Sequence, residues 1–228
     1  MTFNMTFHEL NQTLAVDFGE INNMSDGGFE RGYEAGYKAG MENVPDLLEK
    51  VVTNTLNEYS NEKLESIKPY TFRECTNLTS INLPNVRTLG LQCFHTCTSL
   101  TEVHMPKLTT MNAYAFTDCV NLKLVDFPIL GYLQASSLQN CQSLESADFP
   151  NVNTMGNLVF SGCTNLTKLV LRNNAVCSLS NVAAFSNTPI ANGTGYVYVP
   201  DDLVDSYKVA RNWSTYASQI KPISELNE

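Results

Sequence analysis

The sequence has little positive charge. Its 228 residues include 14 lysines and arginines against 23 aspartates and glutamates, which gives a formal net charge of −9. The basic residues are scattered, whereas proteins that bind nucleic acid gather theirs on one face to neutralise phosphates. The composition therefore argues against a nucleic-acid partner and, for the same reason, against docking on an anionic membrane surface.

Long hydrophobic runs are absent as well. A membrane-spanning helix needs about 18 or more consecutive, mostly apolar residues, and no stretch of this sequence approaches that length. We therefore expect no membrane insertion. The first residues, Met-Thr-Phe-Asn-Met-Thr-Phe-His, lack the basic region and apolar core of a secretory signal. Either the chain is exported by another route, or it stays inside the cell, or a signal has been removed.

What the sequence does have is a strict repeat of 22 residues, marked by Cys75, Cys97, Cys119, Cys141 and Cys163. Each cysteine belongs to a frame F-x-x-C-x-x-L-x-x-I-x-L-P-x-V-x-x-L, whose apolar columns recur with few exceptions. Self-similarity at a fixed period of this length indicates stacked units, because a single unit cannot bury its apolar face alone. The sequence therefore predicts a repeat solenoid.

The L-x-x-I-x-L part of the frame predicts one short β-strand in each repeat. Because side chains alternate along a strand, Ile81 and Leu83 should face the core while Asn82 faces solvent. The proline that follows most of these strands, such as Pro84, lacks an N–H group and ends the hydrogen-bonded ladder. We therefore expect a right-handed leucine-rich-repeat arc, with short parallel strands on its concave face and an irregular or short-helical convex side.

These columns resemble the BspA-like leucine-rich repeats, also called Treponema-type repeats. In that family a Leu-x-x-Ile-x-Leu-Pro strand alternates with an Ile-Gly-x-x-Ala-Phe-x-x-Cys segment, to which residues 88–97 and 111–119 are similar. The resemblance covers about residues 56–200. Leu138 in the phenylalanine column and Ala147 in an aliphatic column depart from the pattern and suggest local repacking. The resemblance implies bacterial surface adhesion and binding of host or matrix proteins.

The seven cysteines could form disulfides, hold a metal or fill the core. The five that mark the repeat recur in an inward-facing column, and free cysteine is among the most buried residue types. Cys93 also lies in a column of small residues, whereas Cys177 lies beyond the regular frame and is expected to be the exposed thiol. A metal site between Cys93 and Cys97 is disfavoured, because zinc prefers four ligands at recognisable spacings and no C-x-x-C pair is present.

A segment with a different pattern begins the sequence. In residues 1–27, apolar residues alternate with polar ones in two short runs, which predicts a β-hairpin arm with one apolar face. An isolated hairpin is only marginally stable in water, so the arm should dock on a partner, on another copy or on the solenoid. The apolar residues are Phe3, Met5, Phe7, Leu14, Val16 and Phe18.

Residues 28–44 then carry a glycine every four residues, each followed by a large apolar or aromatic residue. Glycine costs about 1 kcal/mol at each helical position, so a helix here would need a closely packed partner. The segment is either a helix for docking or oligomerisation, or a flexible linker. The interleaved Glu30 and Arg31 exclude membrane-type pairing. The candidate oligomerisation residues are Gly28, Phe29, Gly32, Tyr33, Gly36, Tyr37 and Gly40.

The solenoid is expected over residues 45–199, with an N-terminal capping helix over residues 46–54. The repeat frame then appears one period early, at Leu56, Tyr59, Leu64 and Ile67. Residues 200–228 predict a helical C-terminal cap, in which Asp201 would cap a helix that runs to about residue 211. Trp213 is interpreted as part of the core of this cap rather than as a binding anchor.

The concave face of an open solenoid is its default binding surface, so its outward columns carry the candidate site. These columns are polar and mildly acidic, and they contain no aromatic residue and no arginine, the usual interface anchors. Binding is therefore expected to be modest, or aided by several copies acting together. The candidate ligand-binding residues are Glu102, His104, Lys123, Asp126, Glu145, Asp148 and Lys168.

No catalytic residue is predicted. The sequence has three histidines and lacks a nucleophile elbow, a phosphate-binding loop and a metal-binding motif. His104 stands one repeat from Asp126, but the nearest nucleophiles, Ser80 and Ser146, lie farther along. We therefore expect no enzymatic activity, no cofactor and no metal.

Two functional hypotheses follow. The first is a non-enzymatic protein-binding or adhesion module of a bacterial protein, which binds through its concave face. The second is a structural or host-attachment component of a phage or prophage particle, because a hairpin followed by Gly-Tyr tetrads resembles modules ahead of such repeats in prophage-encoded proteins. In that case the N-terminal segment would assemble the particle. The cell surface, a phage particle and the cytoplasm all stay open as locations, and the sequence names no ligand.

Overall fold

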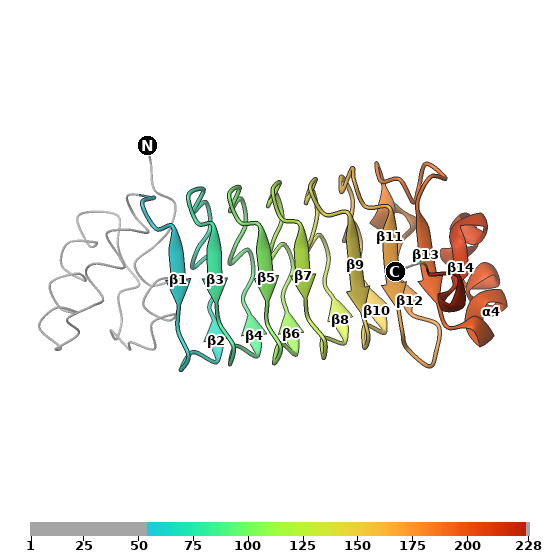
Figure 1. The fold of residues 1–228 in the computed structure, drawn as a ribbon, viewed down its shortest axis with the longest axis horizontal. Helices are drawn as coiled ribbons and strands as arrows, with labels where there is room; N and C mark the ends of the chain where they lie inside the picture. Colours follow the sequence, from blue (N-terminus) through green and yellow to red (C-terminus); the bar gives the residue numbers. More distant parts are fainter. Residues whose placement is uncertain (1–53, 227–228) are drawn as a thin grey trace, which may run out of the picture.

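The computed structural model describes residues 54–226, so the predicted hairpin arm and the Gly/aromatic segment lie outside the described residues, as does nearly all of the N-terminal capping helix. Each repeat makes one turn of a solenoid, and the turns stack side by side in an elongated row (Figure 1). One hydrophobic core, from Leu56 to Ile220, runs through all of them. The predicted repeat solenoid is confirmed.

The predicted strands form a parallel ladder along one side of the solenoid, which we call the ladder face. Equivalent residues of neighbouring repeats pair directly, as Tyr59 does with Ile81 and Val103 with Val125. The pairing of Tyr59 confirms the repeat that the frame placed one period early. The strands are β1 (Glu58–Ser60), β3 (Ser80–Asn82), β5 (Glu102–His104), β7 (Leu124–Asp126), β9 (Ser146–Phe149), β11 (Lys168–Leu171), β13 (Tyr196–Val199) and β14 (Ile220–Pro222).

A second ladder, not foreseen from the sequence, follows the first around each turn. The V-x-x-L part of the frame forms a two-residue strand in which the leucine column is buried and the preceding residue carries a hydroxyl group, as in Thr88-Leu89. This back ladder gives order to a side that was expected to be irregular or short-helical. Its strands are β2 (Ser66–Ile67), β4 (Thr88–Leu89), β6 (Thr110–Met111), β8 (Tyr132–Leu133), β10 (Thr154–Met155) and β12 (Ser178–Leu179).

The turn before each cysteine is also tied to the next repeat. The N–H groups of Tyr70, Phe72 and Glu74 donate to carbonyl oxygens of the following turn at 2.7–2.8 Å. Two residues per turn have positive φ, although the left-handed conformation costs roughly 1–2 kcal/mol for a residue other than glycine. The bonds between repeats hold them there. The two columns are Tyr70, Gln92, Tyr114, Ser136 and Leu158, and Glu74, Thr96, Asp118, Asn140 and Gly162.

The phenylalanine column forms a stack of rings inside the solenoid. The rings of Phe72, Phe94 and Phe116 are nearly parallel, with centroids 5.3 and 5.2 Å apart. Farther along, Phe160 stacks on Phe185 at 5.7 Å. All five rings are fully buried. The column therefore supplies a regular aromatic core at the spacing that the ladders impose.

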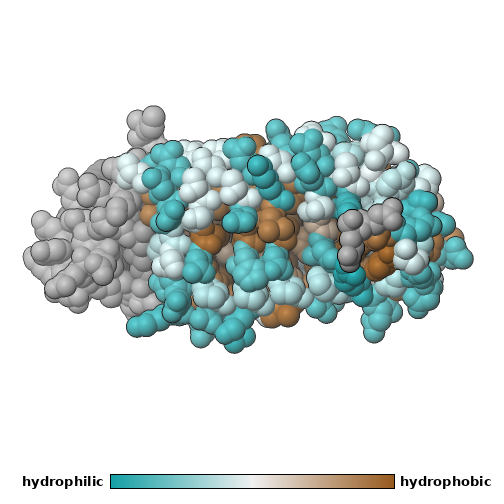
Figure 2. All heavy atoms as spheres, in the orientation of Figure 1, coloured by the Kyte–Doolittle hydropathy of each residue, from teal (hydrophilic) through white to brown (hydrophobic). Residues whose placement is uncertain are grey.

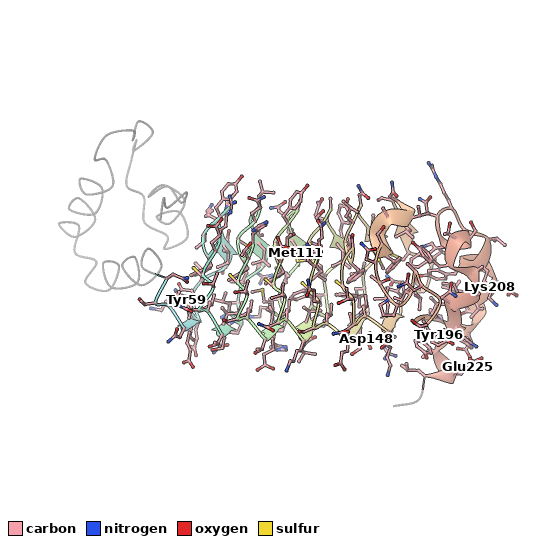
Figure 3. All side chains as sticks on the ribbon, turned by 90° about the horizontal axis from the view of Figure 1, so that it is seen from above. Tyr59, Met111, Asp148, Tyr196, Lys208 and Glu225 are labelled. Atoms are coloured by element: carbon pink, nitrogen blue, oxygen red, sulfur yellow. The ribbon has the colours of Figure 1, made fainter. Side chains whose placement is uncertain are left out.

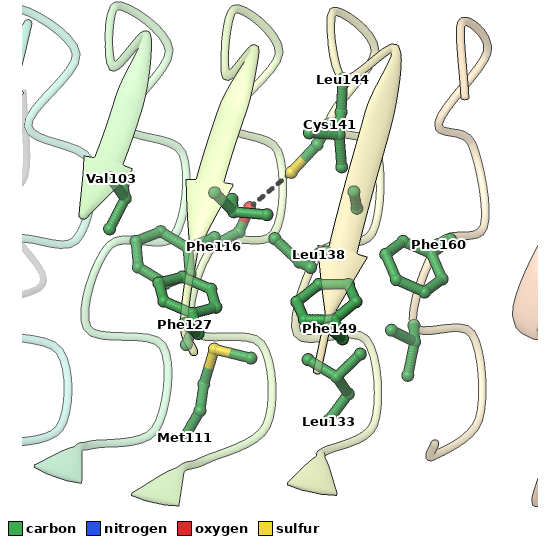
Figure 4. Packing of buried hydrophobic residues seen from close by; sticks show 14 of the residues in the cluster. Val103, Met111, Phe116, Phe127, Leu133, Leu138, Cys141, Leu144, Phe149 and Phe160 are labelled. Atoms are coloured by element: carbon green, nitrogen blue, oxygen red, sulfur yellow. Dashed lines mark hydrogen bonds between the residues drawn. The ribbon is translucent and has the colours of Figure 1, made fainter. Parts of the chain in front are cut away.

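Leu138 interrupts this column, and the neighbouring strand column compensates for it. Phe127 stacks on Phe116 at 5.9 Å, and Phe149 lies 6.1 Å from Phe160, so larger side chains flank the smaller one on both sides (Figure 4). Phe127 and Phe149 occupy a column that holds Leu83, Met105 and Leu171 in the other repeats of the cysteine frame. Because protein interiors are close-packed, the larger side chains of Phe127 and Phe149 fill the space that the smaller Leu138 leaves.

Leu138→Phe should therefore destabilise the protein, even though it restores the repeat pattern. We expect a loss of about 1–3 kcal/mol in the free energy of unfolding, because the space is already filled. Adding Phe127→Leu should recover much of the loss, and chemical denaturation of the two single variants and the double variant measures the coupling. A stabilising Leu138→Phe, or additive effects of the two changes, would contradict this packing.

The cysteine column matches buried carbonyl groups. The thiols of Cys97, Cys119, Cys141 and Cys163 lie 3.0–3.3 Å from carbonyl oxygens of the phenylalanine column, one repeat earlier. Figure 4 draws the bond of Cys141. Cysteine is a small apolar residue with a weak S–H donor, so it fills the site and partners the carbonyl. All seven cysteines are buried and free, which confirms the core interpretation of the repeat cysteines and of Cys93.

The prediction that Cys177 is exposed is wrong. Its N–H group donates to the Tyr207 hydroxyl at 2.8 Å, and its carbonyl oxygen accepts from Trp213 Nε1 at 2.6 Å. The C-terminal cap thus closes over Cys177, a long-range contact that its local sequence does not reveal. Burial raises the pKa of Cys75 and that of Cys177 to about 12.

All seven thiols should therefore resist alkylation in the native protein at neutral pH, because the thiolate is the reactive form and access is blocked. Mass spectrometry after iodoacetamide treatment should show no modification until denaturant unfolds the chain, and then seven alkylated cysteines. Ser178→Cys, at an exposed back-ladder position, is the matched positive control and should react quickly. Stoichiometric labelling of any native cysteine before unfolding would contradict the structure.

The C-terminal cap consists of short helical segments. They are η2 (Asp201–Leu203), α4 (Val204–Val209), η3 (Trp213–Gln219) and η4 (Ile223–Glu225), after η1 (Val182–Phe185) in the last repeat. Trp213 is fully buried against Phe185 and Tyr207, which confirms that it belongs to the cap core. The predicted helix cap at Asp201 is wrong, since its carboxylate accepts the N–H of Ser224 instead, at 3.1 Å. The chain therefore returns to the end of the ladder rather than forming one long helix.

Candidate binding face

The ladder face brings all seven predicted ligand-binding residues to one side of the solenoid. Glu102 and His104 lie on β5, Asp126 on β7, Asp148 on β9 and Lys168 on β11. Lys123 and Glu145 directly precede β7 and β9 and are exposed. The strand positions are on this surface because alternate side chains of a strand point away from the core. The structure therefore gathers the set on one surface, with residues of neighbouring repeats side by side.

His104 and Asp126 form a direct contact on this surface. They are paired in the β5–β7 register, and His104 Nδ1 meets Asp126 Oδ2. The His104 side chain remains 65% exposed, on an open sheet face that does not exclude water. A surface pair of this kind contributes about 0–1 kcal/mol, and it has none of the desolvation that strengthens a catalytic pair. The contact fits a polar binding surface better than an active site.

Asp148 does not present a free carboxylate. Arg172, which stands where the other repeats have proline, reaches back one repeat and places Nε 2.9 Å and Nη2 2.7 Å from Asp148 Oδ2. This hydrogen bond raises the pKa of the Arg172 guanidinium. The acidic spot expected around Asp126 and Asp148 is therefore partly compensated by the Arg172 guanidinium.

The prediction that the ladder face lacks aromatic residues and arginine is wrong, because Arg172 lies beside Asp148 and two tyrosines lie farther along the ladder. β13 and β14 extend the ladder beyond β11, and Tyr196 and Tyr198 project outward from β13, with ring centroids 6.4 Å apart. Lys221 on β14 places its Nζ atom 5.8 Å from the centre of the Tyr196 ring. Figure 3 shows Tyr196 and Asp148 along the same side of the solenoid. The alternation Tyr-Val-Tyr-Val before Pro200 was the sequence signal for these two outward tyrosines.

An apolar residue interrupts the polar surface between these groups. Leu124 on β7 is 51% exposed, although its side chain has the size of a core residue. Figure 2 shows this face with hydrophilic side chains around a small apolar area in its middle repeats. Protein-binding surfaces usually combine an apolar centre, which the partner shields from water, with a surrounding rim of polar groups.

Residues 54–226 contain neither a candidate metal site nor a candidate membrane span. Within this range, no three histidine, cysteine, aspartate or glutamate side chains come close enough to hold a metal ion. The same range contains no helix that is long and apolar enough to cross a membrane.

A second histidine–carboxylate pair lies on the turns, where His95 Nε2 is 3.7 Å from Asp118 Oδ2. Burial lowers the pKa of His95, and the Asp118 carboxylate acts in the opposite direction.

The parallel strand ladder, the repeated L-x-x-I-x-L frame and the outward polar columns define a leucine-rich-repeat protein. The model of the BspA type leucine rich repeat region matches residues 65–191 with six copies. The chain therefore belongs to the BspA-type leucine-rich-repeat family, as its sequence motifs indicated. Leucine-rich-repeat proteins are generally non-enzymatic modules that bind other proteins.

Solved structures show the same fold. A leucine-rich cell surface protein from Faecalibacterium prausnitzii A2-165 is 18% identical with a TM-score of 0.54, over 68% of this chain and 46% of that one. A leucine-rich repeat protein from Eubacterium ventriosum ATCC 27560 is 18% identical with a TM-score of 0.50, over 58% and 43%. The chain thus spans less than half the length of either. A search of curated protein sequences gave no significant match.

Proposed function

We propose that the chain is a non-enzymatic adhesion module that binds a host or matrix protein through its ladder face. The observation that carries the proposal is the exposed Leu124, surrounded by the predicted polar residues on a rigid ladder. Equivalent side chains stand about 4.8 Å apart across parallel strands, so the face offers a regular row of contacts to an extended segment of a partner. The family supports protein binding in general, and the ligand class is our proposal.

The open geometry favours binding over catalysis. His104 and Asp126 are the only described histidine and carboxylate in direct contact on the ladder face, and both are substantially exposed. Stabilising a transition state needs preorganised groups in a site that excludes water. A sheet face that stays wet can still bind a protein, because the partner itself excludes the water over Leu124.

A surface location is supported by one relative. The Faecalibacterium protein is described as a cell surface protein, and the two chains share a fold at 18% identity. We propose the same location for the protein that contains this chain. Export would place the ladder face where it meets host or matrix proteins.

Binding should depend on the ladder face and not on the back ladder. The full chain would be tested by surface plasmon resonance against a panel of purified matrix proteins, including collagen and laminin. For a protein that binds, Leu124→Ser and Asp126→Lys should each raise Kd about tenfold, which corresponds to about 1.4 kcal/mol.

The controls make the same chemical changes elsewhere. Tyr132→Ser removes an exposed apolar residue from the back ladder, and Glu65→Lys reverses an exposed charge next to β2. Both should leave Kd within about twofold, as expected for surface changes outside an interface. Equal losses in the controls and the ladder-face variants, or no binding to any protein of the panel, would count against the proposed function.

The glycine tetrads favour assembly through residues 28–44, which is the second candidate role and would suit a phage or prophage particle. Light scattering should show an oligomer for the full chain and a monomer for residues 45–228. Gly32→Leu with Gly36→Leu should also give a monomer, because a helix pair in close contact has no room for the added side chains. Equal masses for all three proteins would remove this role.

A further inference from the structure

The break in the repeat creates a cluster of hydrogen-bond donors at the C-terminal end of the ladder face. Lys168 pairs with Tyr196, and Tyr198 pairs with Lys221, across β11, β13 and β14. Together these four residues form the Tyr–Lys cluster. The Lys221 Nζ atom lies over the Tyr196 ring, which holds that ammonium group by its negative face. Two phenols and two lysines are therefore carried by neighbouring positions of adjacent strands, with Lys221 in contact with the Tyr196 ring.

Most donors of the Tyr–Lys cluster have no acceptor. Within residues 54–226, the hydroxyl groups of Tyr196 and Tyr198 and the Lys168 ammonium make no hydrogen bond or ion pair. The Lys221 ammonium has one partner, the exposed Glu225 carboxylate of η4, at 3.1 Å. Of the other carboxylates beside the cluster, Asp148 is held by Arg172, and Glu145, whose backbone carbonyl accepts from the Lys168 N–H, forms no ion pair with the Lys168 ammonium among the described residues. The cluster is thus rich in donors and short of acceptors, in a chain with an excess of carboxylates.

Glu225 shows which chemistry the cluster accepts. It is the chain's own carboxylate, held by an ammonium that also contacts the Tyr196 ring, and it raises the pKa of Lys221 through their hydrogen bond. Its side chain is 54% exposed, so the pair is weakly held and an external carboxylate can replace it. Figure 3 shows Glu225 on the same side of the solenoid as Tyr196.

We propose that the Tyr–Lys cluster binds a carboxylate side chain in an extended, acidic segment of a protein partner. The inference rests on the proposed function and identifies the chemistry of its ligand. Leu124 supplies the argument for a peptide: it lies two strands before Lys168, which is about 10 Å, in the column that continues through Ser146. Three residues of extended chain span that distance, so an apolar residue and an acidic residue three positions apart can meet Leu124 and Lys168 together.

The test uses the full chain and a fluorescein-labelled peptide, Gly-Ser-Leu-Ser-Ser-Glu-Glu-Ser-Gly, in fluorescence anisotropy at low salt. The peptide should bind about tenfold tighter than a version with glutamine in place of both glutamates. Lys168→Met and Lys221→Met should each weaken binding about threefold, while Lys63→Met, the same charge change at an exposed position between β1 and β2, should have less than about a twofold effect. Glu225→Gln should strengthen binding about two- to fivefold by freeing Lys221, a gain that damage to the fold does not produce.

Several results would overturn the inference. Equal losses in Lys63→Met and Lys168→Met would show non-specific charge attraction. Unchanged peptide binding by Glu225→Gln would show that Glu225 does not compete with the peptide for Lys221. A sulfated oligosaccharide of equal charge that binds tighter than the peptide, with the same sensitivity to Lys168→Met, would replace the protein segment by a glycan.

The two proposals fail separately. If Leu124→Ser abolishes matrix-protein binding while Lys168→Met and Lys221→Met do not affect it, the ladder face binds proteins and the cluster inference is wrong. If the peptide binds at the cluster but no matrix protein depends on the ladder face, the adhesion proposal is wrong and the anion site remains.

Discussion

The backbone hydrogen bonds between successive turns are the constraint on which this structure depends. Strands on the ladder face, strands of the back ladder and the turn before each cysteine all bond to the next repeat. Every position must therefore lie beside its own equivalent one period later. A repeat protein of this kind is stabilised mainly by such contacts between neighbours. This explains why five consecutive cysteines keep a period of 22 residues. An insertion would shift the ladder face, the back ladder and the turn before the cysteine out of register with the next repeat.

Several unusual residue choices follow from this constraint. Gln92 keeps positive φ while its N–H group donates to Ala113 of the next turn, and Leu158 does so beside Phe160, whose N–H donates to Ala184, although glycine would adopt this backbone at less cost. The cysteine column is retained because a buried carbonyl one repeat earlier gains a thiol donor. Leu138 is tolerated because Phe127 and Phe149 share its space. The ladders fix the spacing, and the core adjusts its volumes within it.

The fold could be predicted from sequence because its information is periodic. Apolar columns at fixed offsets showed the strand, the core face and the early rung at Tyr59. The errors lie where the period ends. Cys177 was placed on the surface because its cover, Tyr207 and Trp213, is distant in sequence. The local sequence predicts a helix cap at Asp201, but its carboxylate accepts the N–H of Ser224, which is 23 residues away in the sequence. The seven candidate residues lie on the ladder face as their columns indicated, but Val170, in one of these columns, is buried, and the two missed tyrosines lie beyond β11.

The same break explains why the residues of the proposed Tyr–Lys cluster lie at one end of the ladder face. Inside the strict repeats, an outward side chain has close neighbours above and below in its column, which favours small or alternately charged residues such as Ser80, Glu102 and Ser146. Beyond β11 the spacing changes: Lys168 pairs with Tyr196, where an unbroken period would place residue 190. Because the connection before β13 is longer and the cap follows it, the outward residues at this end no longer repeat the residue types of the preceding columns. Aromatic and basic residues can then stand there without disturbing the stack, while the regular repeats hold Leu124 at a fixed distance from them.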